Sequence, residues 1–164
     1  MKRKNMVLAA IIVFALGITT YSVFFTGGDG SETASSVQSV TNESGDMEIQ
    51  ISDITADASF YAYDELESKM EVIAVKASDG TIRTAFNTCQ VCYSSGKGYY
   101  VQEGDQLVCQ NCGNTFSMDD VEVTRGGCNP VPINDEQTKT NSDTIVIPKE
   151  FLKEAEVIFK NWKV

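Results

Sequence analysis

Two closely spaced pairs of cysteines constrain this chain more than any other feature of its sequence. Both pairs have the form Cys-x-x-Cys, Cys89 with Cys92 and Cys109 with Cys112, and sixteen residues lie between them. In a tight turn of this form both sulfurs face one point, because the backbone amides of the turn orient them and hydrogen-bond to them. The sixteen intervening residues suffice for one hairpin, so the two turns can offer four thiolates to zinc or iron. The spacing therefore predicts a metal site.

A fifth cysteine follows in the segment Gly126-Gly127-Cys128-Asn129-Pro130. A plain four-cysteine zinc site has no use for a fifth thiol, and an unpaired exposed thiol outside a cell is a liability. We therefore expect Cys128 near the metal, as a ligand, a substitute ligand or an exchange partner. The neighbouring Arg125 would offset accumulated thiolate charge. The alternative is that Cys128 is a small buried residue in a turn.

The chain contains no histidine. Histidine-ligated metals and nucleophiles activated by histidine are thereby excluded, and any metal must be held by thiolates, carboxylates or backbone oxygens. The carboxylates are scattered, and no pair of them is placed for acid–base chemistry. We therefore expect a metal-binding or electron-transfer protein rather than a catalyst, with no evident small-molecule substrate. Iron–sulfur cluster and Zn²⁺ both remain open as the cofactor.

Two readings without a metal also remain. In an oxidising compartment the same four cysteines can form two structural disulfides. A thiol–disulfide redox protein is the other possibility, although neither pair has the preceding tryptophan and following helix of a thioredoxin-like site.

The N-terminus has the pattern of a membrane anchor. Lys2, Arg3 and Lys4 precede an uncharged apolar run, residues 6–25, which would span about 30 Å as a helix. Positive charge before the run and none just after it predicts a cytoplasmic N-terminus and an outer C-terminal domain. A cleaved signal peptide is the alternative, but bulky residues occupy the end where small ones mark a cleavage site. We predict a transmembrane anchor over residues 1–26.

A Gly-, Ser- and Thr-rich segment, residues 27–46, follows and is predicted to be a flexible stalk. The chain beyond residue 26 holds ten basic against 23 acidic residues, a net charge of −13. A domain this acidic would repel nucleic acid phosphates.

Residues 47–164 are predicted to form a single, mainly β (α+β) domain. Alternating or apolar runs indicate strands at 47–51, 69–76, 81–86, 98–102, 106–109, 119–124 and 131–133. Turns at 78–80 and 103–105 make two hairpins, each of which ends on a cysteine pair. The aromatic residues at 60, 61 and 63 are expected in the core. A terminal helix, 149–161, is predicted, with Pro148 able to serve as its first residue; it has one apolar face, which we expect to dock on the sheet.

The sequence resembles the FtrD-like family of membrane iron–sulfur proteins from about Ile49 to Ile133. The resemblance rests on the segments 79–83, 85–92, 97–99, 107–113 and 126–133, with Phe116, and the Gly-Gly-Cys-Asn-Pro ending is the most specific of them. It implies Cys89, Cys92, Cys109 and Cys112 as ligands and Cys128 as a further candidate. It also implies a link to bacterial iron uptake, with an iron–sulfur centre that passes electrons.

Together these observations predict a single-pass, outward-facing metal protein of the cell membrane. Its expected role is that of an accessory or electron-transfer component of iron uptake, with an iron permease or a redox membrane protein as partner and no nucleic acid. The alternatives are a zinc-stabilised β binding module and a disulfide-based redox protein.

Overall fold

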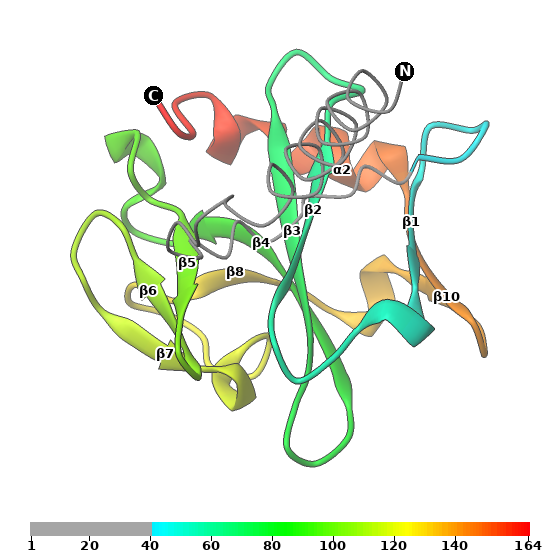
Figure 1. The fold of residues 1–164 in the computed structure, drawn as a ribbon. Coiled ribbons are helices and arrows are strands. Elements are labelled where there is room, and N and C mark those ends of the chain that lie inside the picture. The colour runs from blue at the N-terminus through cyan, green and yellow to red at the C-terminus, as the bar shows by residue number, and fades with distance from the viewer. Residues whose placement is uncertain (1–40) are drawn as a thin grey trace, which may run out of the picture. The chain divides into compact units, whose positions relative to one another are not determined.

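The computed structural model describes residues 41–164 (Figure 1). The predicted anchor, residues 1–26, and most of the predicted stalk lie outside the described residues. The last part of that stalk, residues 41–46, is a turn in which the Asn42 side chain accepts hydrogen bonds from the N–H groups of Ser44 and Asp46. Within residues 41–164 no helix is both long enough and apolar enough to cross a membrane.

A four-stranded antiparallel sheet organises the described part of the chain. Its order is β2-β3-β4-β8, and its strands are β2 (Ser59–Tyr63), β3 (Met70–Lys76), β4 (Ile82–Cys89) and β8 (Pro130–Ile133). The predicted hairpin at residues 78–80 joins β3 to β4, with Lys76 paired to Ile82. Between Phe86 and Cys89 the pairing of β4 with β8 shifts register, so Asn87 and Thr88 form a bulge just before the first cysteine.

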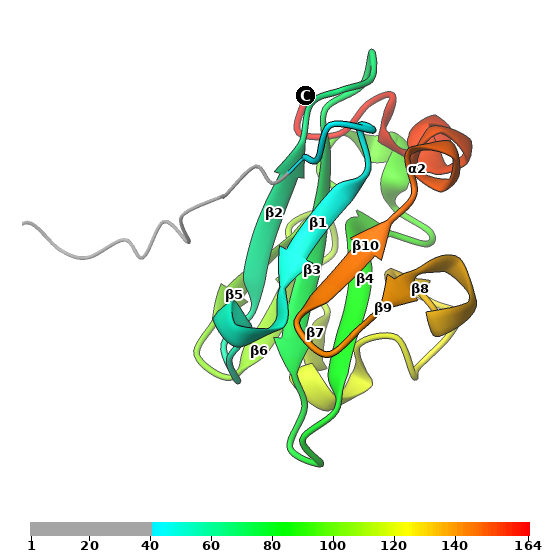
Figure 2. The ribbon, with the colours of Figure 1, turned by 90° about the vertical axis from the view of Figure 1, so that its right-hand side faces the viewer.

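Two smaller antiparallel sheets flank this central sheet. One has the order β5-β6-β7 and consists of β5 (Tyr100–Glu103), β6 (Gln106–Cys109) and β7 (Thr115–Ser117). The other has the order β1-β10-β9 and consists of β1 (Met47–Gln50), β10 (Thr144–Ile147) and β9 (Lys139–Thr140). In Figure 2, β1 and β10 run side by side in front of β3 and β4.

Strand β3 is buried on both faces, because its alternate side chains enter two different apolar clusters. Met70, Val72 and Ala74 join the first cluster, which β1, β10 and the C-terminal helix complete. Ile73 and Val75 join the second cluster, which the sheet β5-β6-β7 covers. Cys89 and Cys109 belong to this second cluster, so the cysteine pairs lie on the face opposite the helix.

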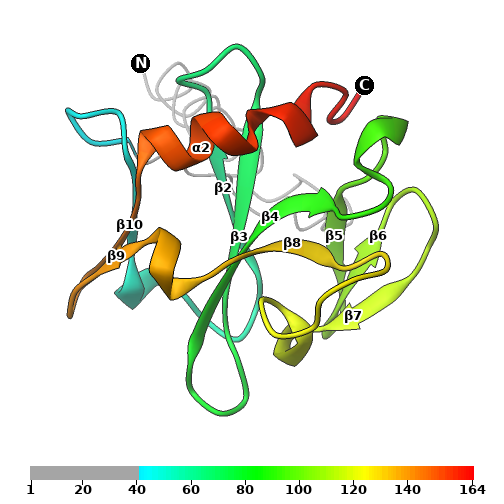
Figure 3. The same ribbon diagram turned by 180° about the vertical axis from the view of Figure 1, so that it is seen from behind.

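The predicted terminal helix is present in a shorter form. Helix α2 (Lys149–Ala155) continues as a 3-10 helix, Glu156–Phe159 (Figure 3). The rings of Phe151 and Phe159 lie beside Phe86 of β4. Leu152 and Phe159 are buried in the first cluster, which confirms the predicted docking. Pro148 does not open the helix as its first residue but precedes it with extended backbone angles.

The predicted strand at residues 119–124 is wrong. Residues Met118–Asp120 form a 3-10 helix, followed by a turn. The cause is local hydrogen bonding: the Ser117 hydroxyl accepts from Asp119 N–H, and the Asp120 carboxylate accepts from Ser117 N–H. This reciprocal cap satisfies the backbone groups that a strand would have paired.

The expected burial of the aromatic cluster is confirmed for Phe60, Tyr61 and Tyr63.

Candidate metal centre

The first cysteine pair lies where β4 ends. Cys89 is the last residue of the strand, and the backbone N–H of Cys92 donates to Cys89 Sγ over 3.1 Å. The returning chain closes on this turn, because Cys89 N–H donates to the carbonyl of Gly98 over 2.7 Å. Gly98 lies so close that a Cβ there would overlap the Cys92 carbonyl group. The turn is therefore fixed by backbone contacts.

The second pair lies where β6 ends, in an analogous turn. Gly113 N–H donates to the carbonyl of Cys109 over 2.8 Å, and Gly113 has φ +74°. This left-handed conformation suits glycine, which lacks a Cβ. Gln110 N–H donates to the Tyr99 carbonyl over 2.8 Å, which joins the second turn to the start of β5.

The loop that carries Cys128 is held by side chains from elsewhere in the domain. Gln90, inside the first cysteine pair, accepts from Gly126 N–H over 3.1 Å and donates to the Pro130 carbonyl over 3.0 Å. The hydroxyl of the buried Tyr100 donates to the carbonyl of Cys128. These contacts hold the loop against the first cysteine pair, so Cys128 has a defined position.

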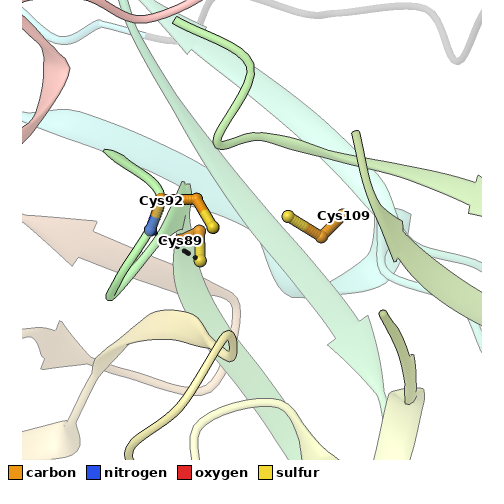
Figure 4. A group of neighbouring side chains, drawn as sticks. All are labelled: Cys89, Cys92 and Cys109. Carbon is orange, nitrogen blue, oxygen red and sulfur yellow. Dashed lines mark hydrogen bonds between the residues drawn. The ribbon is translucent and has the colours of Figure 1, made fainter. Parts of the chain in front are cut away.

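The five sulfurs fall into two overlapping groups of three. In the inner group, Cys89, Cys92 and Cys109, all sulfurs lie within 4.8 Å of one another. The outer group, Cys92, Cys112 and Cys128, meets the same limit, and Cys92 Sγ lies 3.9 Å from Cys128 Sγ. Figure 4 shows the Cys109 sulfur directed toward Cys89 and Cys92. Each group draws on both cysteine pairs.

The two groups differ in exposure. Cys89 and Cys109 are buried, Cys92 and Cys128 are half-buried, and Cys112 is exposed. All five are free thiols in this structure. The centre is thus closed to solvent at Cys89 and Cys109 and open to solvent at Cys112.

The electrostatics of the thiols vary around the centre. Burial raises the pKa of Cys89, but N–H donors of Cys92 and Val91 outweigh it, so this pKa lies below its ordinary value. A hydrogen bond from the Asn114 backbone chiefly lowers the pKa of Cys112. Burial raises the pKa of Cys109 to about 12 and that of Cys92 to about 11.

Contact with the Cys112 side chain, together with burial, raises the pKa of Cys128 to about 11. Two of the five thiols therefore ionise most readily, Cys89 in the inner group and Cys112 in the outer group. Since the thiolate is the form that binds metal, each group contains one pre-activated ligand.

A buried polar network around the β4 bulge stabilises the end of the strand that carries the first cysteine pair. The Asn87 side chain, in the β4 bulge, donates to Glu71 over 2.6 Å and accepts from Tyr100 N–H over 2.7 Å. The Asn87 carbonyl accepts from the indole N–H of Trp162 over 2.7 Å. Lys163 Nζ lies 3.1 Å from both carboxylate oxygens of Glu71. The C-terminal tail thereby closes over the strand that delivers Cys89.

The structure brings all five predicted cysteines together, including Cys128. It does not direct Arg125 toward them: the guanidinium donates to Asn134 Oδ1 over 2.7 Å. Sequence reasoning missed the supporting residues Asn87, Gln90 and Tyr100. The available signal was their position, since Gln90 lies inside the first pair and Tyr100 opens the strand that pairs with Cys109.

The donor set fits a thiolate-bound metal. In a tetrahedral centre with bonds of about 2.3 Å, neighbouring sulfurs lie about 3.8 Å apart, close to the 3.9 Å between Cys92 and Cys128. Thiolates select zinc, iron–sulfur and other soft centres over oxygen-preferring ions such as Mg²⁺ and Ca²⁺. The buried Thr88 hydroxyl, next to Cys89 in the chain, has no protein partner and is available as a hydrogen-bond donor.

Comparison with known proteins gives one result. Neither the curated proteins nor the solved structures include a significant match to the chain. The family model described as "Membrane iron-sulfur containing protein FtrD-like" matches residues 51–159. That span runs from the end of β1 to the end of the C-terminal helical segment and contains all five cysteines. The chain therefore belongs to the FtrD-like family of membrane iron–sulfur proteins.

Proposed function

We propose that this protein carries an iron–sulfur centre on the outer side of the cell membrane and serves bacterial iron uptake as an accessory or electron-transfer component. The observation that carries the proposal is the convergence of five cysteine sulfurs from three separate loops in two groups no wider than 4.8 Å. Membership of the FtrD-like family supports iron–sulfur as the form of the metal.

The protein's own residues perform three tasks at such a centre. Cys89, Cys92, Cys109 and Cys112 hold the metal, with Cys128 beside them. Burial of Cys89 and Cys109 keeps water from one side of the centre, whereas Cys112 leaves the other side accessible. When bound, an iron–sulfur cluster supplies a site that accepts and releases one electron. Exposure on the Cys112 side gives a redox partner a short path to that site.

The membrane part of the proposal rests on the N-terminal sequence. Residues 1–26 anchor the chain with a cytoplasmic N-terminus, and the acidic domain stands outside. An iron permease or a redox membrane protein is the proposed partner, and a net charge of −13 beyond the anchor favours a partner with a basic surface.

The test is metal analysis of the full-length chain, purified anaerobically in mild detergent. We expect iron and acid-labile sulfide in equal amounts, and visible absorption that bleaches on reduction. Replacement of the buried Cys109 by Ser should abolish both iron and colour, whereas the exposed Ser142→Ala variant, remote in sequence from the cysteines, should retain them. A colourless protein with one zinc and no iron would contradict the electron-transfer role.

Structural zinc is the second candidate, and one observation favours it. The 3.9 Å between Cys92 Sγ and Cys128 Sγ is close to the spacing in a tetrahedral zinc–thiolate site. In that case the metal stabilises a β domain that binds a partner protein, without redox chemistry. The same metal analysis separates the two candidates.

A further inference from the structure

The division of five thiols into two groups raises the question of what the fifth one does. Four thiolates complete a tetrahedral centre, and the two Cys-x-x-Cys pairs already supply four. The groups share Cys92, and they differ in that the outer group contains the exposed Cys112 and the half-buried Cys128. An ion arriving from solvent therefore meets the outer group first.

Cys128 is held in place by contacts that need no metal. Gln90 holds its loop on both sides, through Gly126 N–H and the Pro130 carbonyl. Asn129, the next residue, donates to the Gly126 carbonyl, and Tyr100 donates to the Cys128 carbonyl. A thiol that only filled space in a turn would not require this support. The loop presents Cys128 to Cys92 across the open side of the centre.

We propose that Cys128 is a capture ligand: an incoming thiophilic metal ion first binds Cys92, Cys112 and Cys128, and Cys89 and Cys109 then replace Cys128. This inference rests on the proposed function, because it describes how that centre takes up its first metal ion, before any sulfide is added.

The exchange involves no change of oxidation state. The bonds from the metal to Cys128 Sγ and to one remaining water molecule break, and bonds to Cys89 Sγ and Cys109 Sγ form. The thiols release their protons to solvent as they bind, and Cys128 takes one up when it leaves. Cys92, which belongs to both groups, and Cys112, which is not replaced, keep their bonds throughout. The ion is thus held by at least two thiolates at every stage.

The test follows the binding of Co²⁺, whose thiolate charge-transfer absorption reports the number of sulfur ligands, to the reduced, metal-free, full-length chain. Stopped-flow mixing should show a fast phase that depends on cobalt concentration and a slower phase that does not. Cys128→Ser should lose the fast phase and reach the same final spectrum. Cys109→Ser should keep the fast phase but lose the final spectrum and release cobalt readily to a chelator.

Tyr100→Phe is the second variant, because it keeps all five thiols and removes the hydroxyl that donates to the Cys128 carbonyl and also contacts Cys89. It should slow the fast phase and leave the final spectrum unchanged. A Cys128→Ser protein with fewer sulfur ligands in its final spectrum would make Cys128 a resident ligand and overturn the inference. An unaltered fast phase in Cys128→Ser, or no cobalt binding at all, would also overturn it. The iron and sulfide content of the wild-type protein as isolated tests the proposed function separately.

Discussion

Asn87 donates its side-chain amide to the buried carboxylate of Glu71 over 2.6 Å, two residues before the first cysteine of the metal centre. The same side chain accepts from Tyr100 N–H, and the Asn87 carbonyl accepts from Trp162. One bulge residue thus ties β4 to β3, to β5 and to the C-terminal tail.

Asn87→Ala should therefore destabilise the domain by about 3 kcal/mol, since it leaves the buried Tyr100 N–H without a partner and removes one of the two side chains that donate to Glu71. Denaturant unfolding followed by the fluorescence of Trp162, the chain's single tryptophan, measures this loss. The exposed Asn141→Ala variant is the control and should lose less. Equal losses in the two variants would remove the special role of Asn87.

Gly98 and Gly104 form a matched pair for the first cysteine turn. A Cβ at Gly98 would lie 2.8 Å from Tyr93 N and overlap the Cys92 carbonyl, whereas a Cβ at Gly104 meets nothing within 4 Å. Gly98→Ala should displace the turn and lower metal affinity by at least tenfold, as loss of support around a metal site commonly does. Gly104→Ala, at φ +63°, should cost about 1 kcal/mol of stability and leave metal affinity unchanged. Competition with a chelator measures both affinities.

The ion pair between Lys163 and Glu71 joins the C-terminus to β3. The Glu71 side chain is only 5% exposed and that of Lys163 is 38% exposed. The ion pair is therefore intermediate between a solvent-exposed and a buried salt bridge. Lys163→Met should cost about 2 kcal/mol, chiefly because Glu71 keeps a buried charge without its cation. Adding Glu71→Gln should recover part of that loss. A double mutant no more stable than Lys163→Met would show that the charge is not the cause.

Asp79 makes the β3–β4 hairpin sensitive to acid. Hydrogen bonds from Thr81, and then the Arg83 guanidinium, lower the pKa of Asp79 from 3.8 to about 2. Because the folded pKa lies below the unfolded one, the ionised group stabilises the fold above pH 4, and this contribution is lost as the pH falls through 2. Asp79→Asn should be less stable than wild type at pH 7, and the difference should decrease steadily as the pH falls through 2. A stability difference that does not depend on pH would contradict this assignment.

Cys112 should be the most reactive thiol of the reduced, metal-free protein. It is exposed and its pKa is lowered, whereas Cys109 is buried and its pKa is raised to about 12. At pH 7 iodoacetamide should therefore label Cys112 first and Cys109 last, because the thiolate is the nucleophile. Peptide mass spectrometry after short exposures gives the order. Bound metal should suppress labelling at both positions.

The hairpins were predictable because their signals are local. Residues 78–80 form a turn between two apolar runs, and the chain on either side pairs as the alternation requires. The error at residues 119–124 has a local cause too: Ser117 and Asp120 have the spacing of a capping box, which competes with strand pairing. The short strand β9 was missed because two exposed residues carry no hydrophobic pattern.

The residues that support the cysteines were not predictable in the same way. Asn87 and Glu71 are polar residues in strands, and only the tertiary packing buries them and brings Lys163 of the C-terminal tail to Glu71. In the sequence Gln90 has the features of an ordinary turn residue. Its role depends on a contact with Gly126, 36 residues further along the chain, in the loop that carries Cys128. Such contacts join residues far apart in the chain, and no local sequence pattern predicts them.

The sequence by itself determined the kind of chemistry available. The lack of histidine excludes imidazole ligands, the cysteine spacing indicates a thiolate centre, and the segment 126–130 contains a fifth thiol. Only the tertiary structure decided that these thiols divide into an inner group with two buried members and an outer group with the exposed Cys112, and that the groups share Cys92. The reason is that burial follows from which sheet covers which face of β4, and this depends on packing between segments far apart in the chain.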